Sequence, residues 1–319
     1  MSALRRGIGF AAAALAGLAG LAALAGLAGA GVLVSRRSIF GWFDAVNHFA
    51  LIWLALATVG ALGALALPRG RARPAVVAAA ALAGLTFGIP TAREFAAGAA
   101  QPRLEEPTLR ILTFNRWRHT TEPARQAALI RASGADLAVV QETKLDRTMK
   151  ALKDVYPYQA SCGKYCDTVI LSKRPLLAHG PPGLLPWPGG SSLAWVRTTA
   201  PDGRPVVVAT AHLYWPLPPW IHRAQQAQLS DLLRPFGDEL VLVGDFNLTP
   251  WAWSMRQLDA AMAPMTRRTH GLVTFPATWP LPFLALDQVY AGRGWPRSQV
   301  TRLPSAGSDH YPVMVELGR

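Results

Sequence analysis

Glu239-Leu240-Val241-Leu242-Val243-Gly244-Asp245-Phe246-Asn247-Leu248-Thr249-Pro250 gives the clearest indication of the fold of this chain. Its apolar run is too short for a helix and consists of residues that pack on both faces of a sheet, which predicts a buried strand. Gly244 ends the run and allows the backbone to approach a neighbour closely. Asp245 and Asn247 lie two positions apart, so in an extended backbone both side chains point to the same side. The strand is therefore predicted to present a carboxylate and a carboxamide together; a helix N-cap or an Asx turn is the alternative interpretation.

Similar segments recur on both sides of this one. Short apolar runs with the composition of strands are predicted at 109–115, 136–142, 168–172, 205–212 and 285–290, and the stretch 308–315 is predicted to lead into the last strand. Amphipathic stretches at 122–133 and 222–233 are predicted to be helices, the first with Thr121 as its N-cap. From Leu109 onward the chain thus has the alternation of a globular α/β domain, whose length of about 210 residues suffices for one sizeable core.

Polar side chains stand at the ends of these strands, where sheets of α/β proteins bind their ligands. They are carboxylates, carboxamides and imidazoles, and no Ser or Cys lies in a recognisable nucleophile elbow. Taken singly, each has a structural interpretation, such as a hydrogen-bonded core histidine, a helix start or a turn. Their joint occurrence favours a catalytic site instead. The set is Asn115, Glu142, His212, Asp245, Asn247, Asp287, Asp309 and His310.

This set of side chains fits metal-assisted phosphoryl transfer. Glu142 and Asp309 are hard oxygen ligands suited to Mg²⁺ or Mn²⁺, which take few carboxylates from a protein and keep several waters. Phosphoryl transfer further needs an aligned water, a base and donors to the phosphoryl oxygens. Asp245 fits the base, and the two asparagines and two histidines fit the donors. Asp287 fits a carboxylate that holds one imidazole in the required tautomer.

The order of these motifs resembles that of the endonuclease/exonuclease/phosphatase (DNase I-like) superfamily. The resemblance covers roughly residues 109–317, and it implies a four-layered α/β sandwich in which two mixed β-sheets lie face to face between outer helices. It also implies a metal-dependent phosphohydrolase. The motifs are Leu-Thr-Phe-Asn115, Gln141-Glu142, Ile170-Leu171-Ser172, Ala211-His212-Leu213, Gly244-Asp245-Phe246-Asn247, Leu286-Asp287 and Ser308-Asp309-His310.

The resemblance also implies a role for each residue at the metal and at the phosphate. Glu142 would hold the metal, with Asn115 and Asp309 contributing to the same site. Asp167 is a weak candidate for an acidic partner of His212, for which no better one is found.

For the chemical step, the same resemblance implies that Asp245 aligns or deprotonates the attacking water. Asn247 and His212 would contact the phosphate, and Asp287 would pair with His310. Which imidazole acts as an acid or base differs among members of the superfamily and stays open.

The region before this domain has the composition of a membrane segment. The 319-residue chain has a net charge of +13, 51% hydrophobic residues and only 16% charged residues. Uncharged runs near the ~18 to 20 residues needed to cross a bilayer predict three transmembrane helices at about 8–34, 46–67 and 75–95. Pro90 makes the third the weakest, and the first has Gly17, Gly20, Gly26 and Gly29 for close helix packing. Residues 1–100 are thus predicted as a membrane region, 101–108 as a linker and 109–319 as the catalytic domain.

The first apolar run also has features of a cleaved signal peptide, because Arg5 and Arg6 precede it and Ala28-Gly29-Ala30 resembles a cleavage site. Its length favours a retained helix. The basic residues at 5–6 and 69–73 predict that the amino terminus lies inside and the catalytic domain outside. The expected location is therefore a bacterial-type inner membrane, multi-pass, with an extracytoplasmic catalytic domain.

The two cysteines, Cys162 and Cys166, are too few for a four-ligand zinc site. In an oxidising compartment they could close a small loop as a disulfide, and two free thiols are the alternative.

The substrate class is left open between nucleic acid, lipid head group and a small phosphoester. From Gln101 onward the chain has 24 lysines and arginines against 17 acidic residues, which is compatible with a polyanionic partner. The aromatic loop 214–220, Trp251 and Trp253 could stack on bases, lie at a lipid interface or simply pack. The sequence predicts a membrane-tethered metal-dependent phosphohydrolase of the phosphodiesterase or nuclease type, acting by in-line attack of water. A lipid head-group enzyme of the same fold and a non-catalytic membrane receptor are the alternatives, and no protein partner is indicated.

Overall fold

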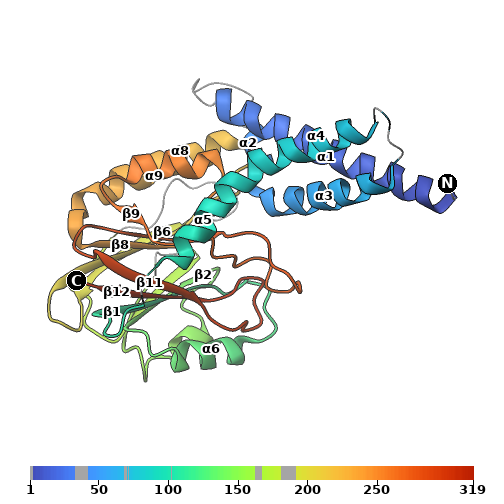
Figure 1. Ribbon diagram of the computed structural model, residues 1–319. Coiled ribbons are helices and arrows are strands. Elements are labelled where there is room, and N and C mark those ends of the chain that lie inside the picture. The colour runs from blue at the N-terminus through green and yellow to red at the C-terminus, as the bar shows by residue number, and fades with distance from the viewer. Residues whose placement is uncertain are drawn as a thin grey trace. The chain divides into compact units, whose positions relative to one another are not determined.

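The computed structural model describes residues 3–32, 42–67, 70, 72–101, 103–161, 167–180 and 192–319. The chain divides into two compact units (Figure 1). A helical unit comprises Met1–Ala96 and Thr249–Arg256, and an α/β unit comprises Ala97–Leu248 and Gln257–Arg319. Cys162 and Cys166, for which a disulfide is one prediction, lie outside the described residues.

In the helical unit, α1, α3 and α4 lie side by side (Figure 1). They approach closely because small residues face one another: a methyl group added at Gly60 would meet Ala16, and one added at Gly63 would meet Ala12. The helices of this part of the chain are α1 (Ala3–Val32), α2 (Asp44–His48), α3 (Ala50–Gly63), the 3-10 turn η2 (Ala64–Ala66), α4 (Ala72–Ala83), the π-helical turn η3 (Gly84–Gly88) and α5 (Ile89–Ala99).

The four glycines expected to mediate packing of α1 differ in their surroundings. Gly20 and Gly26 approach neighbouring helices closely, as predicted. A methyl group added at Gly17 would meet nothing within 4 Å, so the prediction was wrong there. The surroundings of Gly29 lie outside the described residues.

Two described helices, rather than the predicted three, are long and apolar enough to cross a membrane: Gly7–Ala28 and Ala72–Ala99. The middle segment is shorter, Ala50–Ala66, because α2 ends at His48 and a new helix begins at Ala50. The segment with Pro90 was predicted to be the weakest and is instead the longer of the two. Pro90 lies two residues after the π-helical turn, where the regular hydrogen-bond ladder is already interrupted, so its missing N–H group costs little.

The α/β unit contains two mixed six-stranded sheets, as the resemblance implied. In the first sheet β1 and β2 are parallel, and in the second β7 and β8 are parallel; the other pairings are antiparallel. The first sheet has the order β11 (Arg297–Arg302), β12 (Val313–Gly318), β1 (Leu109–Asn115), β2 (Leu137–Gln141), β4 (Thr168–Ser172) and β3 (Tyr158–Ser161). The second has the order β5 (Ala178–His179), β6 (Ser192–Thr199), β7 (Pro205–His212), β8 (Leu240–Asp245), β10 (Asp287–Ala291) and β9 (Thr266–Arg267).

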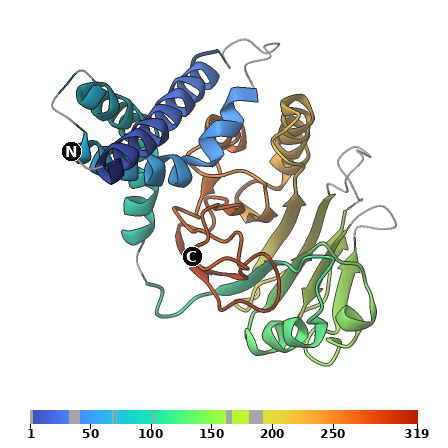
Figure 2. The same cartoon turned by 90° about the vertical axis from the view of Figure 1, so that its right-hand side faces the viewer.

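The two sheets face each other across an apolar core, and helices cover their outer faces. Val139 of the first sheet and Val208 and Val241 of the second belong to one buried cluster between the sheets. A second cluster lies outside the first sheet, under α6 (Pro123–Ala132) and α7 (Arg147–Lys150), and Figure 2 shows α6 in green on that side. Helix α8 (Pro219–Leu233), the turn η4 (Arg234–Glu239) and the later part of α9 (Trp253–Met262) cover the second sheet (Figure 1).

Two details of the prediction concern element ends. The N-cap of α6 is Glu122 rather than Thr121, and its side chain makes no capping hydrogen bond; Pro123 follows in the first turn. Gly244 lies within β8 with φ 146°, and a side chain there would collide with the carbonyl oxygen of Ala211 on β7. The close backbone approach predicted for Gly244 is therefore confirmed.

Candidate active site

The strand register brings the polar strand ends to one edge of each sheet. In the first sheet Asn115 pairs with Gln141, the last residue of β2. In the second sheet Asp245 at the end of β8 lies opposite Asp287 at the start of β10. Because β7 and β8 run parallel, His212 at the end of β7 lies at the same edge. In each sheet the polar residues thus lie side by side at neighbouring strand ends. The sequence placed each of them at the end of a strand but did not show which strands are neighbours.

The side chains of both sheets converge on the carboxylate of Asp245. Asn115 Nδ2 donates to Asp245 Oδ2 at 3.0 Å and to Glu142 Oε1 at 3.2 Å. His310 Nε2 lies 3.4 Å from the same Asp245 oxygen, and His212 Nε2 lies 3.9 Å from it. One buried carboxylate oxygen is therefore the meeting point of two imidazoles and a carboxamide, with a second carboxylate beside them.

Each imidazole is held from behind by its own carboxylate. His310 Nδ1 lies 2.9 Å from Asp287 Oδ2, the pairing that the resemblance implied. His212 Nδ1 lies 3.3 Å from Asp167 Oδ2, so the weak sequence candidate is the actual partner. A carboxylate at Nδ1 fixes the proton there and directs Nε2 of each ring toward Asp245.

These contacts shift the pKa values of the site. Burial lowers the pKa of His310, but the charges of Asp287 and Asp245 outweigh it and raise that pKa to about 10. Burial likewise opposes a net rise in the pKa of His212, which Asp167 and Asp245 cause. Burial raises the pKa of Asp245 against the attraction of the imidazoles. Two imidazoles with raised pKa values beside a buried carboxylate form a site suited to an anionic ligand that brings a proton to be removed.

The neighbouring group of Glu142, Asp309 and Asn115 is suited to a hard cation. Burial works to raise the pKa of Glu142, but the backbone N–H of Arg118, at 3.0 Å, and the charge of His212 hold it below its usual range. Burial, and then repulsion from Glu142, raise the pKa of Asp309. Two carboxylates that repel each other beside a carboxamide are a donor set that a divalent cation would stabilise.

Glu142, Asp309 and Asn115 are too few to surround a cation completely. Among the described residues, no three His, Cys, Asp or Glu side chains already form a cation site. Mg²⁺ commonly binds through one or two carboxylates and keeps several waters, so Glu142 and Asp309 suffice chemically.

The backbone is strained at this edge. The described non-glycine residues with positive φ are Trp117 at 57°, Glu142 at 53° and Asn247 at 51°, and all three adjoin the site. The extended backbone predicted through Asn247 was wrong, because β8 ends at Asp245 and the chain turns there. Asn247 N–H donates to Asp245 Oδ1 at 2.9 Å, which is the Asx turn of the alternative interpretation, and its Nδ2 donates to the carbonyl of Leu213 at 2.8 Å. The turn leaves Asp245 Oδ2 free to face the two imidazoles.

Residues 112–310 match the model of the Endonuclease/Exonuclease/phosphatase family. This chain belongs to that family. A search of curated proteins gave no significant match. Residues before 112, including the helices α1 to α5, lie outside the family match.

Solved structures of low sequence identity share the family fold. An endonuclease/exonuclease/phosphatase from Beutenbergia cavernae is 22% identical with a TM-score of 0.52, covering 67% of this chain and 72% of that one. The human Nocturnin catalytic domain with bound sulfate anion is 15% identical with a TM-score of 0.54, covering 68% and 96%. Beta toxin from Staphylococcus aureus is 15% identical with a TM-score of 0.53, covering 65% and 99%.

Sequence reasoning missed two residues of this candidate site. Arg118 Nη2 lies 3.2 Å from Asp167, and its Nε lies 3.4 Å from Glu142, so one guanidinium bridges the partner of His212 and the proposed metal ligand. Gln141, quoted only as part of a motif, donates from Nε2 to a threonine of each sheet at 3.1 Å and ties the sheets together beneath the site. No local pattern marked Arg118, because its partners lie far along the chain.

The tryptophans predicted to contact a ligand or a lipid surface differ in exposure. Trp251 is 4% exposed and donates from Nε1 to the carbonyl of His48, so its ring packs inside the protein and stacks on no ligand. Trp215, in the loop after His212, is 55% exposed, and Trp220, in the first turn of α8, is 56% exposed.

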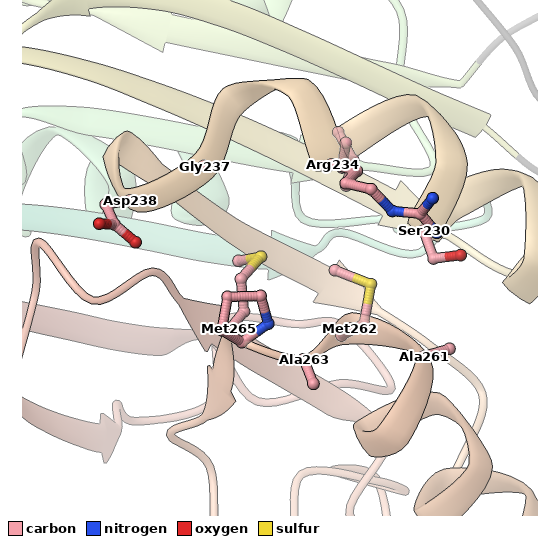
Figure 3. Close-up of a pocket in the computed structure, with 10 residues that line it drawn as sticks. Ser230, Arg234, Gly237, Asp238, Ala261, Met262, Ala263 and Met265 are labelled. Atoms are coloured by element: carbon pink, nitrogen blue, oxygen red, sulfur yellow. The ribbon is translucent and has the colours of Figure 1, made fainter.

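A small pocket of about 40 Å³ lies near α8, η4 and the end of α9 (Figure 3). It contains none of the candidate site residues. The charged residues that line it are Arg234, which pairs with Asp231, and Asp238, which pairs with Arg293. A space of this size holds one or two waters, so we assign it no ligand.

Proposed function

We propose that this protein is a divalent-metal-dependent phosphohydrolase of the phosphodiesterase or nuclease type, tethered to a membrane by its helical unit. The observation that carries the proposal is the convergence on Asp245 Oδ2 of Asn115, His212 and His310, with Glu142 beside them. A base, cationic donors and a hard-cation donor set within one buried cluster are the parts that hydrolysis of a phosphate ester requires.

The proposed roles follow from the geometry. Glu142 and Asp309, with Asn115, would hold Mg²⁺ or Mn²⁺, which when bound neutralises charge on the phosphoryl oxygens. Asp245 accepts the proton of the attacking water while the water oxygen bonds to phosphorus. The ester oxygen on the opposite side of the phosphorus departs.

The two imidazoles face the same phosphoryl group. In this proposal His310, held by Asp287, and His212, held by Asp167, donate to the phosphoryl oxygens or to the departing oxygen. In this proposal Asn247 acts through the turn at Asp245, since its own amide donates to Leu213.

The exposed side chains of the helical unit support the membrane tether. Phe10, Leu21, Leu62 and Leu65 are between 64% and 75% exposed, while alanines and glycines fill the helix contacts. A water-soluble helical bundle buries its large apolar side chains, whereas a membrane bundle turns them to lipid.

We further propose that the catalytic domain lies on the extracytoplasmic side. This requires that Ala50–Ala66 also crosses the bilayer, because an even number of crossings would return the chain to the side of the amino terminus. Its length is at the lower end of the ~17 to 25 residues found in spanning helices. A periplasmic reporter fused after Arg319 should be active, and a fusion active only in the cytosol would refute the orientation.

The activity and its metal requirement are tested together. The full-length protein in detergent is given plasmid DNA, bis(p-nitrophenyl) phosphate or a panel of phospholipid head-group esters, with Mg²⁺, with Mn²⁺ or with EDTA. At least one ester should be hydrolysed, EDTA should abolish the rate, and added Mg²⁺ should restore it, because the carboxylate pair is built for a hard cation.

The control is the same assay with Mg²⁺ and without EDTA. Hydrolysis that survives EDTA would reject the metal mechanism. Binding of a phosphate ester without turnover of any substrate would favour the membrane receptor instead.

A further inference from the structure

A segment that directly follows the catalytic strand folds with the helical unit. Thr249–Arg256 begins two residues after Asn247, yet it is assigned to the same compact unit as α1 to α4. It contains the start of α9, whose first residue is Trp253.

The start of α9 is capped by a residue from the other end of the sequence. Asp44 of α2 accepts hydrogen bonds from the backbone N–H groups of Trp253 at 2.9 Å and Ser254 at 2.8 Å, one on each carboxylate oxygen. Asn47 Nδ2 donates to the same carboxylate at 2.9 Å. An N-cap usually lies directly before its helix, and here the capping carboxylate is 209 positions away.

A second residue of α2 holds the beginning of the segment. His48 Nδ1 accepts a hydrogen bond from the backbone N–H of Thr249 at 3.2 Å and lies 3.1 Å from its hydroxyl. Trp251 Nε1 donates to the carbonyl of His48 at 3.2 Å. The segment is thus fixed at its first residue, in its middle and at the start of its helix.

The chemistry of these contacts shows that they are specific. Asp44 and His48 are each 4% exposed in a part of the chain that is otherwise largely apolar. Burying a carboxylate in such surroundings is unfavourable unless every oxygen is paired, and here three donors pair it. Small apolar residues suffice for the contacts between the other helices of this unit. Packing of α2 against α1 therefore does not explain the carboxylate of Asp44.

We propose that Asp44 and His48 are positioning residues for the phosphoesterase site. By holding Thr249–Arg256 they fix the chain that leaves Asp245 and Asn247. Just before this segment, the turn at Asp245 already holds Asn247. On the other side of Thr249, the carbonyl of Leu248 accepts from Gln288 Nε2 at 3.1 Å, so the path is held on both sides of one peptide bond. Asp44 and His48 then act on the site through the chain itself, and this role rests on the proposed function.

The test uses the full-length protein in detergent with the best phosphodiester substrate. Asp44→Ala and His48→Ala are expected to lower kcat by about 10-fold with KM changed by less than about 2-fold, because small displacements of catalytic groups affect the chemical step more than binding. Asp44→Asn keeps one acceptor oxygen and is expected to lie between the wild type and Asp44→Ala.

A second readout follows the segment itself. In Asp44→Ala, hydrogen exchange of the Trp253 and Ser254 amides should become about 3- to 30-fold faster, as expected for a lost N-cap. Thr91→Val is the matched control: Thr91 is equally buried in the helical unit but donates only to carbonyls of its own helical region, at 2.7 and 3.0 Å. It should leave kcat and the exchange of these amides unchanged.

The outcomes separate this proposal from the proposed function. Wild-type kcat in both Asp44→Ala and His48→Ala would overturn the positioning role while leaving the hydrolase assignment intact, whatever the exchange rates. An equal loss of kcat in Thr91→Val would also overturn it, since general loosening of the helices would then be the cause. Absence of turnover by the wild type on every substrate would refute the hydrolase and the positioning role together.

Discussion

Replacement of Asp245 by asparagine is expected to lower kcat by about 10³-fold or more, with KM changed by less than about 3-fold. Asparagine keeps the size of the side chain and an oxygen for the turn at Asn247 N–H, which Asp245 Oδ1 accepts at 2.9 Å. It removes the basic oxygen on which Asn115, His212 and His310 converge. Binding of the substrate phosphate should survive, because both imidazoles remain.

The measurement is the steady-state rate of the full-length protein with saturating Mg²⁺. Asp259→Asn is the matched control, since it makes the same change at a carboxylate that pairs with Arg267 and takes no part in the site. The control should retain a kcat close to that of the wild type. If Asp245→Asn keeps more than one tenth of the wild-type kcat, Asp245 is not the base.

Replacement of Glu142 by glutamine is expected to weaken Mg²⁺ binding by at least about 10-fold. Glutamine can still accept from Asn115 and from the Arg118 N–H, so the hydrogen bonds of the site can form. What disappears is the negative charge that a hard cation requires. We therefore expect the Mg²⁺ concentration needed for half-maximal activity to rise, with the fold preserved.

Metal binding is also measured without turnover, from the loss of the free Mn²⁺ electron paramagnetic resonance signal on addition of protein. Glu316→Gln is a close control, because the side chain of Glu316 is 19% exposed against 18% for Glu142 and pairs with Arg110 on the surface. Equal Mn²⁺ affinity in Glu142→Gln and the wild type would show that the cation binds elsewhere.

The central strands could be predicted from sequence because strands buried on both faces consist of continuous apolar runs. The predicted limits at 168–172 and 205–212 coincide with β4 and β7, which are almost entirely buried. Edge strands lack this signal. β11, Arg-Ser-Gln-Val-Thr-Arg, has one buried residue, and the other five are half-exposed or exposed, so its assignment depends on pairing with β12 rather than on its own composition.

The site was predictable in its residue types and less so in its geometry. Strand ends located Asp245 and His310, but the left-handed turn at Asn247 depends on hydrogen bonds to Asp245 and Leu213 that local sequence does not reveal. The partner of His212 lies 45 positions earlier, at Asp167, and no sequence motif marks it.

The same limit explains the helical unit. Hydropathy alone predicted one apolar span over 46–67, but it gave no indication that Asp44 and His48 bind a segment some 200 residues later. The break between α2, which ends at His48, and α3, which begins at Ala50, shortens the continuous helix to fewer residues than the predicted span.

The central claim is that water held at Asp245 attacks phosphorus, and hydrolysis in ¹⁸O-labelled water tests it most directly. With the phosphodiester that the full-length protein hydrolyses fastest, we predict one ¹⁸O atom in the phosphate product and none in the released alcohol, with formation of this product lost in Asp245→Asn. Label in the alcohol, or labelled phosphate formed equally fast by Asp245→Asn, would contradict the account.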